Sequence, residues 1–154
     1  MEKGEVHVSK FKDAAAVLEF AIREEQEAAD FYQAMAAKAS GERMQQVFAS
    51  FAQEELEHKR KLQNIELEKS ADFSHERISD MGPDRYAVEQ DAEPDMSYPQ
   101  ALKLVMAKEQ AAFRLYSHLA EAAQDPEVRE LLLALAEEEA KHKLSFELEL
   151  DEIR

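Results

Sequence analysis

Hydrophobic and polar positions along the chain repeat with the period of a helix. Apolar residues recur at alternating steps of three and four, the spacing that places them on one face of an α-helix. The pattern predicts helices over residues 11–39, 43–69, 97–123 and 127–151. Because each apolar face must be buried, we expect the four helices to share one core, as in a four-helix bundle.

The connections between these segments differ in length. Gly41 suits the end of one helix, and Asp125, which precedes a proline, suits the start of another, so tight turns are expected at both places. Residues 70–96 hold several helix breakers and are long enough to run the length of a helix. We therefore expect two antiparallel hairpins, residues 11–69 and 97–151, joined by a long crossover.

An internal repeat relates the two hairpins. A shift of 84 residues aligns them without a gap, and the polar residues align as a set. The aligned pairs are Glu25 with Glu109, Tyr32 with Tyr116, Glu55 with Glu139, and His58 with His142. A shared Ala-rich composition is the alternative explanation, but we favour a duplicated helical hairpin within one domain over residues 1–154.

Composition supports an all-α fold and excludes several functions. With three glycines, four prolines and 45% hydrophobic residues, the chain is typical of a helical protein. The net charge of -15 argues against nucleic acid and anionic membrane surfaces as partners. The absence of cysteine excludes disulfides and thiolate metal sites. The sequence also lacks the apolar run of a signal peptide or a membrane span, so we expect a cytoplasmic protein.

Six polar residues interrupt the apolar stripes and carry the candidate chemistry. The first and third helices each contribute one glutamate to the stripe, and the second and fourth each contribute a Glu-x-x-His pair. They are Glu25, Glu109, Glu55, His58, Glu139 and His142. Counting from the turns, all six are expected at one level in the middle of the bundle.

Four ionised carboxylates in a bundle core would cost more than a domain of this size can absorb without compensation. Two divalent cations would neutralise them, and mixed carboxylate and imidazole ligands suit iron or manganese, with zinc less typical. The arrangement matches the ligand set of di-iron and di-manganese carboxylate bundles. Buried histidines with ordinary surface carboxylates are the alternative. The interpretation that we favour makes the six residues ligands of two iron ions, with manganese or zinc as alternatives.

Other polar residues are assigned less specific roles. Tyr32 and Tyr116 lie on the inward stripes, where each could hydrogen-bond and orient a ligating carboxylate or simply pack in the core. Five glutamates next to the predicted ligands are interpreted as surface charge: Glu24, Glu54, Glu57, Glu137 and Glu138. Three histidines without partners in the repeat are interpreted as ordinary polar residues: His7, His75 and His118.

With these residues in place, the chain resembles the rubrerythrin branch of the ferritin-like superfamily. The resemblance covers both hairpins and is carried by the segments AIREEQEAADFY, FASFAQEELEHKRKL, AKEQAAFRLY and LALAEEEAKHK. It implies a ferritin-like bundle, the six metal ligands named above, and a preference for a homodimer, in which the crossover could carry the second hairpin onto the other subunit.

Two departures from the family limit what the resemblance implies. Typical rubrerythrins have a further ligating glutamate one turn after the third-helix glutamate, where this chain has Ala112. They also end in a four-cysteine rubredoxin domain, and this sequence has no cysteine. Any reductase activity would therefore need a separate, rubredoxin-like electron donor.

Three functions are compatible with this pattern. The one that we favour is a di-iron oxidoreductase that reduces hydrogen peroxide or dioxygen with electrons from an external donor. The second is a ferroxidase or iron-handling protein that oxidises Fe(II) at the same site. The third is a helical interaction module whose metal is structural.

Overall fold

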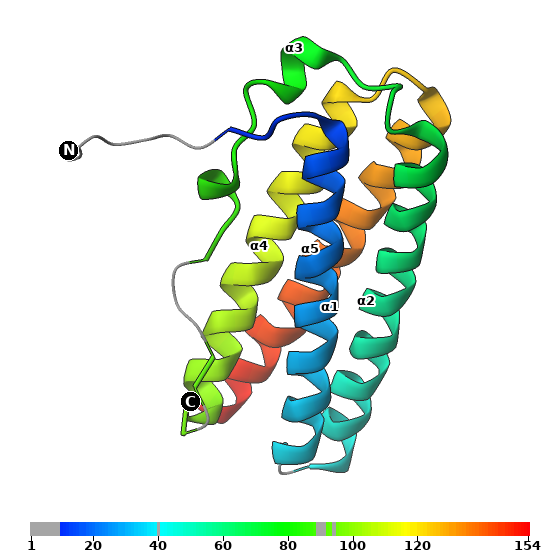
Figure 1. Cartoon of the computed structure of the whole chain (residues 1–154). Helices are drawn as coiled ribbons and strands as arrows, with labels where there is room; N and C mark the ends of the chain where they lie inside the picture. The colour runs from blue at the N-terminus through cyan, green and yellow to red at the C-terminus, as the bar shows by residue number, and fades with distance from the viewer. Residues whose placement is uncertain (1–9, 40, 89–91, 94) are drawn as a thin grey trace, which may run out of the picture.

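A computed structural model describes residues 10–39, 41–88, 92–93 and 95–154, so the predicted polar residue His7 lies outside the described residues. Four long helices form an antiparallel bundle in Figure 1. They are α1 (Ala14–Lys38), α2 (Glu42–Lys69), α4 (Tyr98–Ala122) and α5 (Pro126–Ile153). The predicted all-α fold of two helical hairpins is confirmed.

Three of the four long helices, α1, α4 and α5, begin at residues whose side chains cap them, whereas Gly41 before α2 provides no side-chain cap. The Asp13 carboxylate accepts a hydrogen bond from the Ala16 amide at 2.9 Å, which satisfies one of the free amides at the start of α1. Ser97 and Gln100 form a reciprocal capping box at the start of α4. Asp125 caps α5, and Pro126 occupies its first turn. These caps fix the ends of both hairpins and therefore the level at which their side chains meet.

The crossover between the hairpins contains structure that the sequence pattern did not predict. It includes a short helix α3 (His75–Ile78) and a 3-10 turn η1 (Pro83–Arg85), and α4 begins at the end of the bundle opposite to α3 (Figure 1). The Tyr86 hydroxyl lies 2.6 Å from Nδ1 of His118 on α4. The amide of Phe11 also donates to the carbonyl of Met81 at 3.0 Å. These bonds attach the crossover to the bundle.

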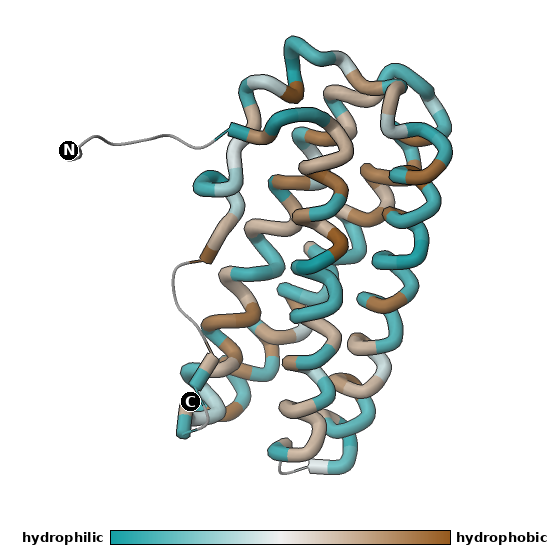
Figure 2. Tube along the Cα trace, viewed as in Figure 1, coloured by the Kyte–Doolittle hydropathy of each residue, from teal (hydrophilic) through white to brown (hydrophobic). Residues whose placement is uncertain are grey.

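The core consists of two apolar clusters at different levels of the bundle. One cluster includes Leu18, Leu62, Leu119 and Leu132, and the other includes Phe48, Leu102, Phe146 and Leu150. Figure 2 shows hydrophilic and hydrophobic residues alternating along each long helix, as expected when one face of each is buried. Burial of these side chains holds the four helices together, and buried polar residues lie between the clusters.

None of the helices in the described part of the chain is both long enough and apolar enough to cross a membrane.

Candidate metal centre

The structure brings the six predicted polar residues together in the middle of the bundle. Each long helix contributes at least one of them, and all are buried. The most enclosed are Glu55 and His58, each with 0% of its surface exposed. Buried carboxylates are rare in proteins unless they are paired or bind a cation, so this cluster needs compensation.

The six residues form two overlapping groups whose potential ligand atoms lie within 4.8 Å of one another. One group consists of Glu25, Glu55, His58 and Glu139, and the other of Glu55, Glu109, Glu139 and His142. Glu55 and Glu139 belong to both groups. The other four residues form two ends, Glu25 with His58 and Glu109 with His142. The geometry therefore distinguishes two shared carboxylates from two terminal pairs, a distinction that the sequence pattern leaves open.

Several atoms that point into the cluster lack hydrogen-bond partners among the described residues. They are both carboxylate oxygens of Glu55, one oxygen each of Glu109 and Glu139, and Nδ1 of His58 and His142. The His58 Nδ1 lies only 2.9 Å from Glu139 Oε1 and 3.2 Å from Glu55 Oε1, but without the alignment of a hydrogen bond. Each unsatisfied buried group costs about 1–3 kcal/mol. Cations at the centre of the cluster would satisfy these atoms, so the residues fit a dinuclear metal site.

Carboxylates outside the cluster orient both imidazoles. The Nε2 atom of His58 lies 2.8 Å from Glu138 Oε1, and Nε2 of His142 lies 3.1 Å from Glu54 Oε1. A carboxylate can only accept, so Nε2 carries the hydrogen, and in the neutral imidazole the lone pair on Nδ1 faces the cluster. Histidine ligands of metal ions are commonly oriented in this way.

The interpretation of Glu54 and Glu138 as surface charge is therefore wrong. Their side chains are only partly exposed, at 42% and 36%, and each reaches the histidine of the other hairpin. A sequence signal was present, since both residues directly precede the Glu of a Glu-x-x-His pair and align in the repeat. The contact itself depends on how α2 packs against α5.

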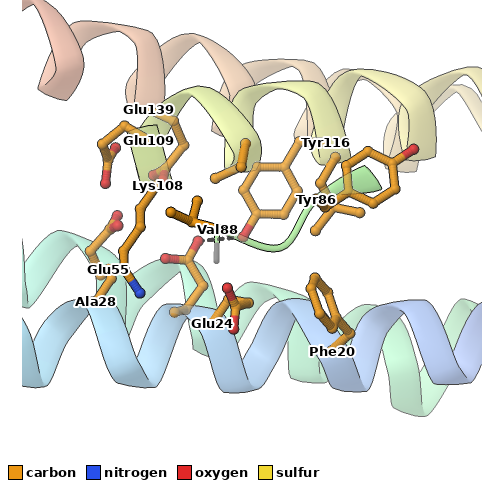
Figure 3. Close-up of a pocket in the computed structure, with 14 residues that line it drawn as sticks. Phe20, Glu24, Ala28, Glu55, Tyr86, Val88, Lys108, Glu109, Tyr116 and Glu139 are labelled. Atoms are coloured by element: carbon orange, nitrogen blue, oxygen red, sulfur yellow. Dashed lines mark hydrogen bonds between the residues drawn. The ribbon is translucent and has the colours of Figure 1, made fainter. Parts of the chain in front are cut away.

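Two tyrosines hold the terminal carboxylates across the bundle. The Tyr32 hydroxyl on α1 donates to Glu109 on α4, and the Tyr116 hydroxyl on α4 donates to Glu25 on α1. The second bond is the dashed line at Tyr116 in Figure 3. Both rings are buried, so the phenols hydrogen-bond the carboxylates and also pack in the core.

Burial and mutual repulsion shift the protonation of the cluster. Burial raises the pKa of Glu55 and of Glu139 well above the usual carboxyl range, and the neighbouring glutamates raise both further. Burial alone would lower the pKa of His58, but the adjacent carboxylates of Glu25 and Glu55 favour the protonated imidazole, outweigh that effect and raise the pKa to about 11. The pKa of His142 is raised for the same kind of reason, with Glu109 as its main partner. Without a cation, the cluster therefore retains protons near neutral pH.

The remaining residues interpreted as surface groups have different surroundings. Glu137 is exposed and Glu57 is partly exposed, and they are paired with Lys141 and Arg60, each on its own helix. Glu24 is only partly buried and lines a cavity that reaches the cluster. Burial raises the pKa of Glu24, as does the charge of Glu27.

Comparison with known proteins gives two matches. The sequence profile of the rubrerythrin family matches residues 16–150. A crystal structure described as that of a ferritin-like diiron-carboxylate protein from Thermotoga maritima superposes with a TM-score of 0.78 at 18% sequence identity, covering 94% of this chain and 99% of that chain. No curated protein matches the chain. At this identity the structural likeness shows the fold, which is the ferritin-like bundle expected from the sequence.

Proposed function

The chain belongs to the rubrerythrin family, and from this premise we propose that it is a di-iron oxidoreductase that reduces hydrogen peroxide or dioxygen. Electrons come from a separate, rubredoxin-like donor protein, and the chain acts as a homodimer in the cytoplasm. The six buried residues would hold two iron ions, and Glu55 and Glu139, which belong to both groups of potential ligands, would contribute to both metal positions.

The observation that carries this proposal is the set of unsatisfied atoms at the centre of the bundle. Glu55, Glu109 and Glu139 contribute carboxylate oxygens, and His58 and His142 contribute Nδ1 atoms. Two divalent cations would balance the four carboxylates and leave two neutral imidazoles. A single ion would leave about half of the carboxylate charge buried without compensation, which costs several kcal/mol per group. The two overlapping groups support two ions held by shared carboxylates.

When bound and reduced, two iron ions would supply two electrons, enough to convert hydrogen peroxide and two protons into two waters, or dioxygen and two protons into hydrogen peroxide. The residues of the chain hold the site for this reaction. Glu138 and Glu54 keep the Nδ1 lone pairs directed inward. Tyr32 and Tyr116 fix the terminal carboxylates. The apolar clusters on either side limit the access of water.

Elemental mass spectrometry and rapid mixing test the proposal. Protein purified without added metal should contain about two iron ions per chain, and the double variant Glu55→Ala, His142→Ala should contain none. The matched control is Glu57→Ala, which removes a partly exposed glutamate of α2 that belongs to neither group of potential ligands. Mixed anaerobically with hydrogen peroxide, the reduced protein should be oxidised much faster than free Fe(II).

Different outcomes would contradict different parts of the proposal. A failure to bind stoichiometric metal after anaerobic Fe(II) loading would rule out the metal centre. Two bound ions that do not react with peroxide or dioxygen would leave a structural metal and rule out the oxidoreductase. Oxidation followed by uptake of more iron would favour the ferroxidase.

A further inference from the structure

A small cavity between α1 and α4 reaches the buried carboxylates. Its volume is about 30 Å³, and Figure 3 shows the side chains around it. Six of the lining residues are partly exposed and form its outer part: Phe20, Glu24, Ala28, Val88, Lys108 and Ala112. The cavity therefore extends from the surface of the bundle to the candidate metal centre.

The inner end of the cavity faces both halves of the centre. It is lined by the two shared carboxylates, Glu55 and Glu139, and by both terminal carboxylates, Glu25 and Glu109. Neither imidazole is among the described residues that line it. A molecule in the cavity would thus approach both metal positions at once, from the side away from the histidines.

Two alanines at equivalent positions of the repeat keep this cavity open. Ala28 and Ala112 lie one helical turn after Glu25 and Glu109, on the same faces of α1 and α4. Because both alanines line the cavity, a leucine at either position would narrow it. One water molecule needs about 10–15 Å³ of such a volume, so a cavity of this size admits only small molecules.

The walls of the outer part favour an uncharged solute. Phe20, Val88 and the two alanines are apolar, and Glu24 and Lys108 contribute opposite charges from equivalent positions of the repeat. In Figure 3 the Lys108 side chain extends from α4 toward α1. A hydrated divalent cation would lose much of its hydration here, whereas a neutral diatomic or peroxide molecule would lose little.

We propose that this cavity binds the oxidant, a molecule of two linked oxygen atoms, and that Ala28 and Ala112 set a size limit that excludes organic hydroperoxides. The inference rests on the proposed function and specifies the substrate class of the same site. Hydrogen peroxide and dioxygen are both small and uncharged enough for the cavity. The rates at which each oxidises the reduced protein, measured separately, show which of them is the oxidant.

The test uses metal-loaded protein and a variant that fills the cavity. Xenon-pressurised crystals of the wild type should show a xenon site between α1 and α4, and crystals of Ala112→Leu should lack it. The matched control is Ala107→Leu, which adds the same side chain at an exposed position of α4 that does not line the cavity. Metal content and helical circular dichroism should be unchanged in both variants. Ala28→Leu repeats the test on α1 should Ala112→Leu fold poorly.

Stopped-flow oxidation of the reduced protein provides the second readout. Ala112→Leu should slow the reaction with hydrogen peroxide at least tenfold, and Ala107→Leu should not. The wild type should react at least tenfold more slowly with tert-butyl hydroperoxide than with hydrogen peroxide, and Ala112→Gly should reduce that difference.

The outcomes separate this inference from the proposed function. Normal peroxide oxidation in a metal-loaded Ala112→Leu or Ala28→Leu variant that has lost the xenon site would overturn the cavity inference alone. Equal wild-type rates with the two hydroperoxides would overturn the size limit. A metal-loaded wild type that does not react with any of these oxidants would overturn the proposed function, and the oxidant role of the cavity with it, whatever the xenon data show.

Discussion

The Nε2 atom of His58 lies 2.8 Å from Oε1 of Glu138, a residue of the opposite hairpin. The repeat provides the equivalent contact, in which Glu54 accepts from His142 at 3.1 Å. Each hairpin therefore contributes a histidine to the centre and the carboxylate that orients the other hairpin's histidine. This exchange makes the candidate metal centre depend on the packing of α2 against α5.

Replacing Glu138 with Gln should weaken metal binding without unfolding the protein. The amide keeps an acceptor for His58 but loses the charge that makes the imidazole a better ligand, so affinity should fall about 10- to 100-fold. Competition with a chromophoric chelator measures the affinity. The control is Glu137→Gln, because Glu137 is exposed and paired with Lys141 on its own helix. If both substitutions weakened metal binding equally, Glu138 would act through its negative charge and not through its contact with His58.

Replacing either buried tyrosine should destabilise the metal-free protein. In Tyr116→Phe, the buried carboxylate of Glu25 loses its phenol donor, which should lower the free energy of unfolding by about 1–3 kcal/mol. Tyr32→Phe should have a similar effect through Glu109, because the two tyrosines are equivalent in the repeat. Urea unfolding in the presence of a chelator measures both.

Tyr98→Phe is the matched control for the tyrosine variants. Tyr98 also donates to a glutamate, Glu149, at 3.1 Å, but in a partly exposed position outside the centre. Loss of this hydrogen bond should lower the free energy of unfolding by less than Tyr116→Phe does, since water can replace a hydrogen bond at a partly exposed position. A cost equal to that of Tyr116→Phe would mean that the buried tyrosines have no special role at the centre.

Metal binding should release protons and become tighter as the pH rises. The pKa of His58 is raised to about 11 in the metal-free fold, and the pKa values of Glu55 and Glu139 are raised above their usual range. A raised pKa means that the group holds its proton near neutral pH, and a metal ion must displace that proton. Calorimetry of Mn²⁺ binding in buffers of different ionisation enthalpy measures the release. A heat that is independent of the buffer would contradict the prediction.

The sequence was sufficient to predict the bundle and the position of the six polar residues. Helical periodicity places Glu25 and Glu55 on buried faces, and their distances from the turn at Gly41 place them at one level. The repeat then gives the same expectation for Glu109 and Glu139. The structure brings these residues together, while their role as metal ligands stays a prediction.

Other features of the site depend on contacts between helices that periodicity does not specify. Glu54 and Glu138 lie outside the inward stripes of their helices, and the packing of α2 against α5 brings each to the histidine of the other hairpin. The cavity beside Ala28 likewise depends on how the crossover residue Val88 and α4 lie against α1. Sequence position gives the direction of a side chain, but the spacing of neighbouring helices decides what it contacts.

The difference between shared and terminal carboxylates gives a prediction of metal stoichiometry. Glu139 belongs to both groups of potential ligands, whereas Glu25 belongs to one. Glu139→Ala should therefore abolish stoichiometric binding, because both positions lose a charged ligand. Glu25→Ala should retain about one ion per chain, held by the group that it leaves intact. Elemental analysis after anaerobic Fe(II) loading and gel filtration measures both values.

The repeat makes this prediction stricter, because each variant has an equivalent in the other hairpin. Glu55→Ala should behave like Glu139→Ala, and Glu109→Ala should behave like Glu25→Ala, since the two groups differ only in their terminal pairs. Glu57→Ala is again the control and should retain about two ions. If all four variants lost both ions, the two metal ions would bind cooperatively. The distinction between shared and terminal carboxylates would then have no effect on the number of ions bound. If Glu139→Ala alone kept an ion, the assignment of the shared carboxylates would be wrong. Both groups of potential ligands include Glu139, whereas one of them includes Glu25.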